Sequence, residues 1–145
     1  MKPLKTTLLY FLLISALVSL IYSGCEPVDQ NTTGVTRDDY VGEWLFNESF
    51  KSTESQSYIV NITLDPNNSS QVIIGNLGSP GSQDITVKGT VTSGQLVVSK
   101  QNMSNGWAIE GSGKMSNVAN SAMSWTYTIW AGGNQDMYTA TATLQ

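Results

Sequence analysis

The stretch YVGEWLF, residues 40–46, decides how the rest of this chain folds. Read with the period of two that a β-strand imposes, Gly42, Trp44 and Phe46 point one way and Glu43 points the other. Large aromatic side chains on one face of a strand dominate the cores of most small domains. We therefore expect this stretch to open the first strand of a β-domain whose interior is lined by aromatic rings.

The chain after residue 39 shows no helical period and alternates between apolar and polar side chains, with turn signals between the runs. Short links between successive strands make them antiparallel neighbours. Curling such a sheet into an up-and-down barrel buries one face of every strand and removes the exposed edges. We therefore predict an all-β antiparallel barrel of about eight strands, with a two-sheet sandwich as the alternative. After the first strand, we expect strands at residues 57–64, 71–77, 84–92, 95–100, 107–114, 121–130 and 136–144.

Aromatic side chains supply most of the predicted interior. They could line a cavity for an apolar or amphipathic ligand, because concave binding sites combine aromatic rings with a few polar groups. They could instead fill the barrel, since a small eight-stranded barrel has room for little else. Ala140 and Ala142, on the strand expected beside the largest rings, fit the second interpretation. The candidates are Trp44, Phe46, Tyr58, Trp107, Trp125, Tyr127 and Tyr138.

Glu48 departs from this pattern, because the alternation turns its carboxylate toward the interior between Phe46 and Phe50. A buried carboxylate needs a partner, a water molecule or a place at the barrel mouth, where it could contact a ligand. We therefore include Glu48 among the candidate ligand-binding residues. The alternative, which the sequence alone favours, is that the strand ends or bulges before Glu48 and leaves it in solvent.

Composition excludes several classes of function. The 145 residues carry 11 acidic and 7 basic side chains, a net charge of -4, which argues against a nucleic-acid partner. The chain has no histidine and one cysteine, so the usual zinc sites, nucleophile pairs and histidine bases lack their components. We expect no enzymatic activity, no catalytic residue, no metal site and no cofactor.

The first residues have the pattern of a secretory signal, predicted at residues 1–24. A start with two lysines is followed by an uncharged apolar run and by small residues. The YSGC of residues 22–25 resembles a bacterial lipobox, in which signal peptidase II cuts before the cysteine and the thiol then carries diacylglycerol. Tyr22 departs from the usual Leu or Val. The resemblance implies a lipoprotein lipidated at Cys25, and an ordinary signal with an unmodified thiol is the alternative.

Residues 25–39 are polar and have no apolar period, so we predict a flexible tether before a barrel domain at residues 40–145. Gly42 and Trp44 resemble the Gly-x-Trp signature of lipocalins. In that family the Trp closes one end of the barrel and the Gly leaves room where the chain crosses that end. This resemblance implies a closed end near the first strand.

The resemblance extends along most of the chain. A lipobox, a polar tether, YVGEW, DPNNSSQVII, GWAIEGSG and a closing MSWTYTI resemble the small lipocalin-like lipoproteins of Bacteroidetes, a group without established activity. The chain departs from true lipocalins, because it has no Thr-Asp-Tyr motif at a later turn and no arginine near the last strand. A lipocalin-like shape is therefore implied, while a lipocalin-like ligand is not.

Together these patterns predict a lipid-anchored cell-envelope protein, in the outer membrane of a Gram-negative bacterium. Its partners would be the membrane, through the anchor, and a small apolar or amphipathic ligand bound without catalysis. The alternative function is that of a structural or protein-interaction lipoprotein, which acts through its threonine-rich outer face and its loops.

Overall fold

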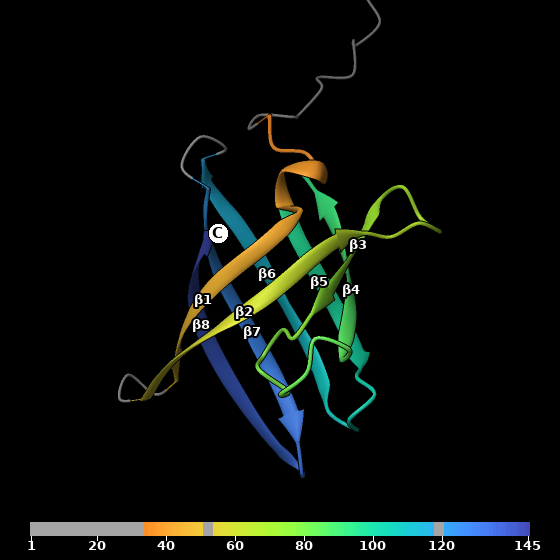
Figure 1. Ribbon diagram of the computed structural model, residues 1–145. Helices are drawn as coiled ribbons and strands as arrows, with labels where there is room; N and C mark the ends of the chain where they lie inside the picture. The colour runs from red at the N-terminus through yellow and green to blue at the C-terminus, as the bar shows by residue number, and fades with distance from the viewer. Residues whose placement is uncertain (1–33, 51–53, 118–120) are drawn as a thin grey trace, which may run out of the picture. The chain divides into compact units, whose positions relative to one another are not determined.

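The computed structural model describes residues 34–50, 54–117 and 121–145, apart from the side chain at position 117. This part of the chain forms a closed antiparallel barrel whose strands follow sequence order (Figure 1). The predicted barrel is confirmed and the alternative sandwich is wrong. The predicted signal, Cys25 and most of the tether lie outside the described residues. The elements are η1 (Asp38–Tyr40), β1 (Gly42–Phe50), β2 (Glu54–Leu64), β3 (Gln71–Gly75), β4 (Thr86–Thr92), β5 (Gln95–Asn102), β6 (Ala108–Asn117), β7 (Ala122–Ala131) and β8 (Asn134–Leu144).

The first and last strands close the barrel. β1 pairs with β2 on one side and with β8 on the other, from Trp44 opposite Leu144 to Phe50 opposite Tyr138. The predicted strands match the observed ones within a few residues. β3 ends at Gly75, because Asn76 takes a left-handed φ of 65° and begins the β3–β4 loop. No helix in the described ranges is long and apolar enough to cross a membrane.

The alternation predicted from the sequence sets the core. Trp44, Phe46, Trp125 and Tyr127 are at most 2% exposed. The registers place Trp125 opposite Ala140 on β8 and opposite Gly113 on β6. Small residues thus flank the ring of Trp125, and side chains fill the middle of the barrel as the packing interpretation predicts.

The expectation that β1 ends or bulges before Glu48 is wrong. β1 continues to Phe50 and pairs on both sides without a shift of register. Glu48 is only 3% exposed, so its carboxylate faces the interior. The strand tolerates this because donors on neighbouring strands satisfy the carboxylate, as described below.

One end of the barrel is closed by η1 and the residues around it. Tyr40 is fully buried, and its hydroxyl donates to the carbonyl oxygen of Gly94 at 3.0 Å. Trp44 Nε1 donates to the carbonyl oxygen of Tyr40 at 2.9 Å. At Gly42, φ is 144° and an added Cβ would lie 2.6 Å from Leu144 Cδ1. The Trp closes this end and the Gly leaves room for the last strand, as the Gly-x-Trp resemblance implies.

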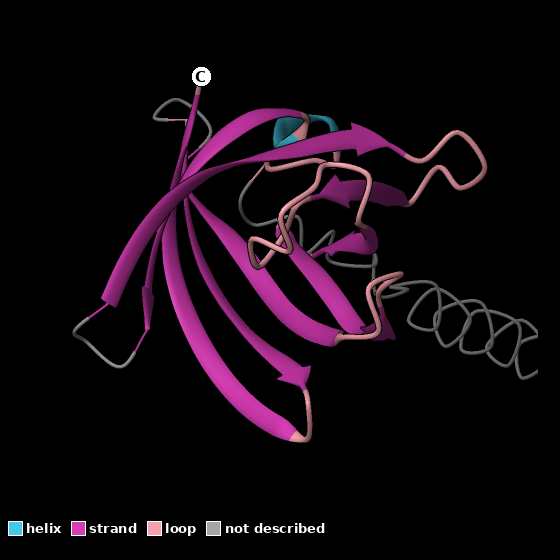
Figure 2. Cartoon of the chain, turned by 60° about the horizontal axis from the view of Figure 1, so that its bottom comes forward, coloured by secondary structure: helices cyan, strands magenta, loops and turns pink. Residues whose placement is uncertain are grey.

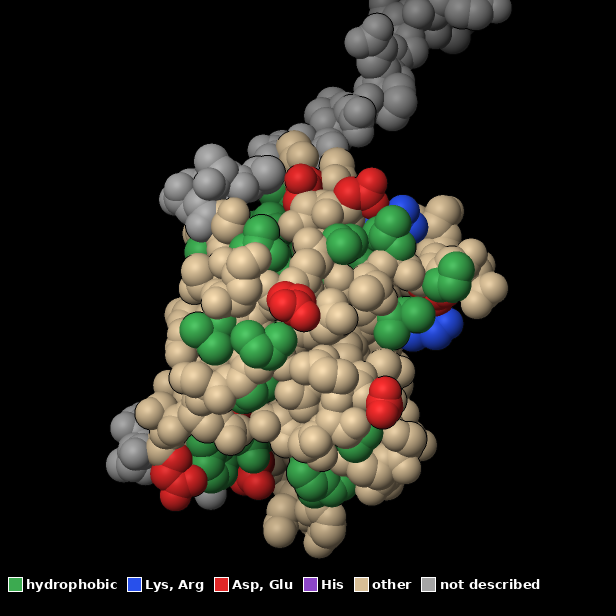
Figure 3. Space-filling view, viewed as in Figure 1, with side chains coloured by type: hydrophobic (Ala, Val, Ile, Leu, Met, Phe, Trp, Pro, Cys, Tyr) green, Lys and Arg blue, Asp and Glu red, His purple; other side chains and the backbone are tan. Residues whose placement is uncertain are grey.

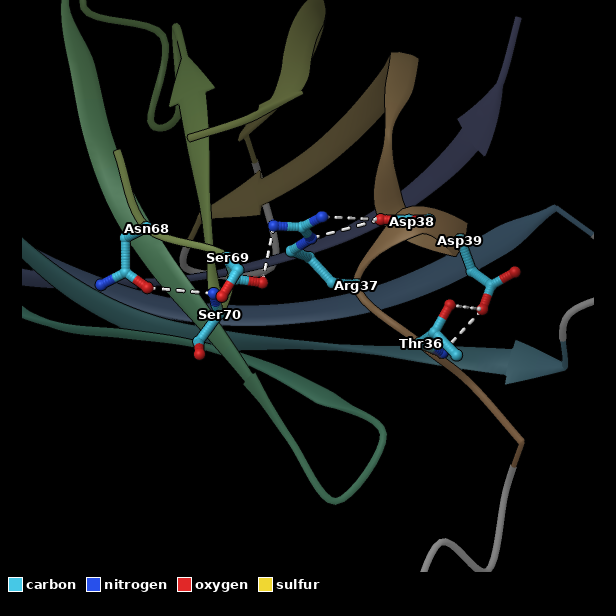
Figure 4. Close-up of polar contacts among 7 residues, drawn as sticks. All are labelled: Thr36, Arg37, Asp38, Asp39, Asn68, Ser69 and Ser70. Carbon is cyan, nitrogen blue, oxygen red and sulfur yellow. Dashed lines mark hydrogen bonds and ion pairs between the residues drawn. The ribbon is translucent and has the colours of Figure 1, made fainter. Parts of the chain in front are cut away.

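The predicted tether, residues 25–39, extends too far along the chain, because its last residues pack at the closed end. Val35 is 6% exposed and belongs to the core, so the packed domain begins before residue 40. Figure 4 shows how the segment is held: Arg37 Nη1 donates to the carbonyl oxygen of Ser69 at 2.6 Å, and Arg37 pairs with Asp38 at 3.2 Å. Asp39 Oδ2 accepts from the backbone nitrogen of Thr36 at 2.6 Å. These contacts fix η1 against the turn between β2 and β3.

The opposite end carries the end of β1, the start of β2 and the connections β3–β4, β5–β6 and β7–β8 (Figure 2). The β3–β4 loop lies over part of this end, because Leu77 is 1% exposed and belongs to the core. An added Cβ at Gly78 would lie 2.7 Å from Ile129 Cδ1, so the loop backbone approaches β7 closely.

Gly113 provides a test of the packing. A Cβ at this position would lie 2.2 Å from Trp125 Cε2, inside a filled core. We expect Gly113→Ala to lower the free energy of unfolding by about 1–3 kcal/mol, because the indole must move or the strand must bend. Chemical denaturation measures the change. The control is Ser112→Ala, the preceding residue on β6, which should stay within about 0.5 kcal/mol of the parent. Equal stability of all three proteins would contradict the proposed packing.

Candidate functional site

Polar and aromatic side chains meet at the end of the barrel opposite η1. We call Glu48, Phe50, Gln56, Tyr58, Tyr127 and Tyr138 the mouth cluster. They come from β1, β2, β7 and β8, which are consecutive around the closed sheet. The cluster therefore forms where the first two strands of the barrel meet the last two.

The strand registers bring these residues together. Glu48 lies opposite Gln56 on β2 and opposite Ala140 on β8. Phe50 and Tyr127 both lie opposite Tyr138 on β8. The small side chain of Ala140 leaves space on the β8 side of Glu48, so the carboxylate fits between two strands that otherwise carry rings.

The carboxylate of Glu48 accepts a hydrogen bond on each oxygen. Gln56 Nε2 donates to Oε1 at 2.7 Å, and the hydroxyl of Tyr58 donates to Oε2 at 2.8 Å. The hydroxyls of Tyr58 and Tyr127 are 2.9 Å apart. Because the proton of Tyr58 is directed at Glu48, the hydroxyl of Tyr127 is the donor of this second bond. Such a chain of donors polarises toward the carboxylate and strengthens each bond in it.

Aromatic rings surround this hydrogen-bonded chain. Tyr138 stacks on Tyr127, with ring centroids 5.4 Å apart and an interplanar angle of 13°. Phe50 stacks on the Tyr138 ring at 4.9 Å and 25°. Below them, Phe46 contacts both Tyr58 at 5.8 Å and Trp125 at 5.7 Å. The mouth thus has a stacked wall of three rings and an apolar floor.

Burial and negative charge determine how the tyrosines ionise. Burial, and then the charge of Glu48, raise the pKa of Tyr58 far above its ordinary value. Burial also raises the pKa of Tyr138, with smaller contributions from the charges of Asp136, Glu48 and Glu54. Both phenols therefore remain neutral hydrogen-bond donors at physiological pH.

A pocket of about 340 Å³ opens at the mouth cluster. Its lining combines two carboxylates, two aromatic rings and two uncharged polar side chains. The lining residues are Glu48, Phe50, Glu54, Ser55, Gln56 and Tyr138. Pockets of this volume lie at the lower end of the range that holds small molecules.

A second hollow, of about 470 Å³, lies against the outer face of β1, β2, β7 and β8. Exposed polar side chains line it, among them Asn47, Ser57, Thr126, Thr139 and Thr141. We call it the outer groove. Most of its lining residues carry hydroxyl groups, and its aromatic lining residue, Trp125, is only 2% exposed, whereas aromatic side chains give most small-molecule pockets their apolar contact.

The structure divides the eight predicted ligand-binding residues into three groups. Glu48, Tyr58, Tyr127 and Tyr138 meet in the mouth cluster. Phe46 and Trp125 form its floor. The remaining two lie elsewhere: Trp44 at the closed end, and Trp107 half-buried in the β5–β6 loop.

Two members of the mouth cluster were missing from the predicted set. Phe50 shares the inward face of β1 and could have been included by extending the alternation past Glu48. Gln56 precedes the predicted start of its strand at residue 57, because the polar run at the beginning of β2 carries no apolar alternation. Counting back from Tyr58 in steps of two would have found it.

In the described ranges, no group of three or more His, Cys, Asp or Glu side chains is arranged to hold a metal ion. Asp65, which is buried, pairs instead with Lys88 Nζ at 2.7 Å.

Comparisons with known proteins identify the fold. No family model matches the chain, and no curated protein matches it significantly. Among solved structures, it is similar to the redesigned β-barrel b11L5F_LGL, with a TM-score of 0.55, 11% identity, and 76% of this chain and 95% of that chain covered. It is also similar to the redesigned β-barrel mFAP1 bound to DFHBI, with a TM-score of 0.53, 13% identity, and 74% and 97% covered. A third, EF1p2_mFAP2b bound to DFHBI, has a TM-score of 0.52, 12% identity, and 74% and 95% covered. At these identities the similarity concerns the fold alone.

The raised pKa of Tyr58 predicts how stability depends on alkaline pH. The folded state holds this proton more tightly than the unfolded state, whose ordinary pKa is 10.0. The contribution of Tyr58 is therefore complete below that pH and is lost as the pH rises above it. We expect the free energy of unfolding to fall between about pH 9 and pH 11, and to fall less in Tyr58→Phe.

Chemical denaturation at several pH values measures both slopes. The pH profile of Tyr40→Phe is compared with that of Tyr58→Phe, because burial also raises the pKa of Tyr40, which lies at the other end of the barrel. Parallel pH profiles for the parent and Tyr58→Phe would contradict the buried, hydrogen-bonded position of Tyr58.

Proposed function

We propose that this chain is a non-enzymatic binding protein that holds a small amphipathic ligand in the pocket at the mouth cluster. The observation that carries the proposal is a buried, hydrogen-bonded carboxylate in a pocket of about 340 Å³ that is also lined by two rings of a three-ring aromatic stack. Rings supply apolar contact and a few polar groups fix orientation in most small-molecule sites. The barrel-shaped proteins bound to DFHBI support the idea that a barrel of this size can hold a small molecule.

The ligand lies at the mouth in this proposal because the middle of the barrel is filled. Trp44, Phe46 and Trp125 are all fully buried or nearly so. The closed end is sealed by Tyr40, whose hydroxyl reaches the backbone of β6 and of the β4–β5 turn. A ligand would therefore contact Phe50 and Tyr138, which are only partly buried.

We also propose that the chain is a cell-envelope lipoprotein anchored through Cys25, as its lipobox resemblance implies. The described chain enters the barrel at the closed end, with Val35 in the core. The mouth cluster lies at the other end. The proposed thioether would carry acyl chains, and each buried CH₂ group contributes about 0.8 kcal/mol of membrane affinity.

Metabolic labelling tests the anchor. Cells that make the protein are grown with an azido fatty acid, and the purified chain is examined for the label. We expect label in the parent and none in Cys25→Ser, because the thiol is the attachment point. Label that survives in Cys25→Ser would contradict the proposal, as would an unlabelled parent.

Native mass spectrometry tests the binding function. Protein purified gently from cells should carry a small molecule, and Tyr138→Ala should lose it, because the central ring of the stacked wall is gone. Stacked aromatic pairs contribute about 0.5–1.5 kcal/mol each, so we expect the affinity to fall roughly tenfold or more. Circular dichroism confirms that the variant is folded. The matched control is Thr139→Ala, next in the chain but facing outward, which should keep the ligand.

The same experiment separates the second candidate function, which is binding at the outer face. The outer groove supports this candidate because it is a hollow of about 470 Å³ lined by hydroxyl groups. Loss of a bound partner in Thr139→Ala, but not in Tyr138→Ala, would assign the function to the outer groove. A parent protein that carries no small molecule would contradict the mouth proposal.

A further inference from the structure

The outer groove is built from two rows of exposed, uncharged polar side chains that cross β2, β1, β8 and β7. All eight line the groove, and we call them the polar grid. The strand registers give the rows as Ser55, Ser49, Thr139 and Thr126, and Ser57, Asn47, Thr141 and Ser124. Neighbouring strands lie about 4.8 Å apart, and residues two apart on one strand are separated by about 6.8 Å. The grid therefore presents its polar groups at regular intervals in two directions.

Most hydroxyl groups of the polar grid are free to bind a ligand. The hydroxyl of Ser57 donates to Oδ1 of Asn47 at 2.7 Å. Within the described ranges, the other six hydroxyl groups form no hydrogen bond with another protein group. A hydroxyl is both a donor and an acceptor, and one that loses its water without gaining a new partner costs free energy. A ligand that covers the grid must therefore return a hydrogen bond to each hydroxyl that it dehydrates.

The polar grid carries no charge of its own, because its members are serines, threonines and one asparagine. Glu48 also lines the outer groove, but its carboxylate is directed inward, where Gln56 and Tyr58 donate to it. In Figure 3, most of the surface between the red acidic side chains is tan, the colour of uncharged polar side chains and backbone. Side chains of these types cannot form an ion pair with a charged ligand that gives up its water. The grid therefore favours a neutral ligand.

A second hollow adjoins the outer groove along one of the two rows. It has a volume of about 480 Å³ and shares Thr126 with the outer groove. Ser112 on β6 lies opposite Thr126, and Val97 on β5 lies opposite Ser112. Glu110 is the charged residue of its lining. A ligand that occupies both hollows must be elongated and must cross the strands.

Apolar ligands fit this surface poorly. The apolar lining residues of the outer groove, Trp125 and Ala140, are only 2% and 6% exposed. A lipid chain or an aromatic ligand would dehydrate the hydroxyl groups of the grid without offering hydrogen bonds in return. A sugar chain has the matching chemistry, because each of its hydroxyl groups also donates and accepts.

From these features we infer that the outer groove binds a neutral oligosaccharide, which lies across β1, β8 and β7. This inference rests on the second candidate function, binding at the outer face, and adds the chemistry of the partner. It is independent of the ligand proposed for the mouth pocket. Because water competes for every hydrogen bond, each contact contributes little, and affinity depends on how many hydroxyl groups are engaged at once. The length of the sugar chain should therefore decide how tightly it binds.

Titration with four sugars tests the dependence on length and charge. The full chain is prepared in micelles of a detergent without a sugar headgroup, and dissociation constants are measured by NMR at neutral pH. The probes are glucose, maltohexaose, xylohexaose and the anionic hexagalacturonate. We expect at least one neutral hexasaccharide to bind about tenfold more tightly than glucose, because it engages more hydroxyl groups. Hexagalacturonate should bind more weakly than that hexasaccharide.

Threonine-to-valine substitutions locate the site. Thr139→Val and Thr141→Val each remove one hydroxyl and keep the β-branched shape that suits a strand, so the barrel should keep its fold. Each should weaken binding of the neutral hexasaccharide about fivefold, because one hydrogen bond is lost. The matched control is Thr143→Val, which removes the same group from the same exposed face of β8 but outside the groove. It should leave the dissociation constant unchanged.

The results separate this inference from the proposals beside it. Failure of both neutral hexasaccharides to bind, equally tight binding of hexagalacturonate, or an equal loss in Thr139→Val and Thr143→Val would overturn the sugar inference. A protein partner that the parent retains and Thr139→Ala loses would still assign a function to the outer face. The ligand of the mouth pocket is decided separately by native mass spectrometry. The titration of the parent needs no variant, so the inference can be refuted even if a variant fails to fold.

Discussion

The pairing of β1 with β8 is the interaction on which the rest of the structure depends. It joins the first strand to the last, so the sheet closes and each strand turns one face inward. The same register places Glu48 opposite Ala140 and Phe50 opposite Tyr138. A slip of one residue would turn Glu48 outward and replace the aromatic face of β1 with its polar face. Closure of the barrel and assembly of the mouth cluster are therefore the same event.

The two ends of the barrel have different chemistry because different parts of the chain reach them. At the closed end, Tyr40 and Trp44 are buried and hydrogen-bonded, and Arg37 holds η1 against the β2–β3 turn. At the other end, Leu77 covers part of the opening, and the mouth cluster remains beside it. One end therefore contributes stability and receives the N-terminal segment, while the other supplies the pocket.

Glu48 is difficult to explain by stability alone. An apolar side chain of similar size would fill the space between Gln56 and Ala140 without the cost of removing a carboxylate from water, and such replacements of buried charges are often neutral or stabilising. The carboxylate instead requires donors from Gln56 and Tyr58, and Tyr127 in turn supports Tyr58. This requirement supports the proposal that the group serves a ligand.

The site was only partly predictable from the sequence. The alternation on β1, β7 and β8 correctly turned Phe46, Tyr127 and Tyr138 inward, because neighbouring side chains along a strand point to opposite faces whatever lies across from them. The same rule pointed to Glu48, yet the sequence favoured its exposure, since the donors that satisfy it come from another strand. Trp44 lies at the closed end, and Trp107 lies in the β5–β6 loop, at the mouth end but not in the mouth cluster. Alternation gives no position along or around the barrel axis.

Local sequence by itself determined the strands, their inward faces and the antiparallel order, since these follow from the period of two and from short turns. Only the tertiary structure decided three other features. The first is the buried 3-10 turn at Tyr40, which is too short to have a pattern of its own. The second is the inclusion of Val35 in the core, and the third is the meeting of Glu48, Gln56 and Tyr138 from three strands. The first two depend on which elements pack together after closure. The third depends on register, which is a property of paired strands that no single strand encodes.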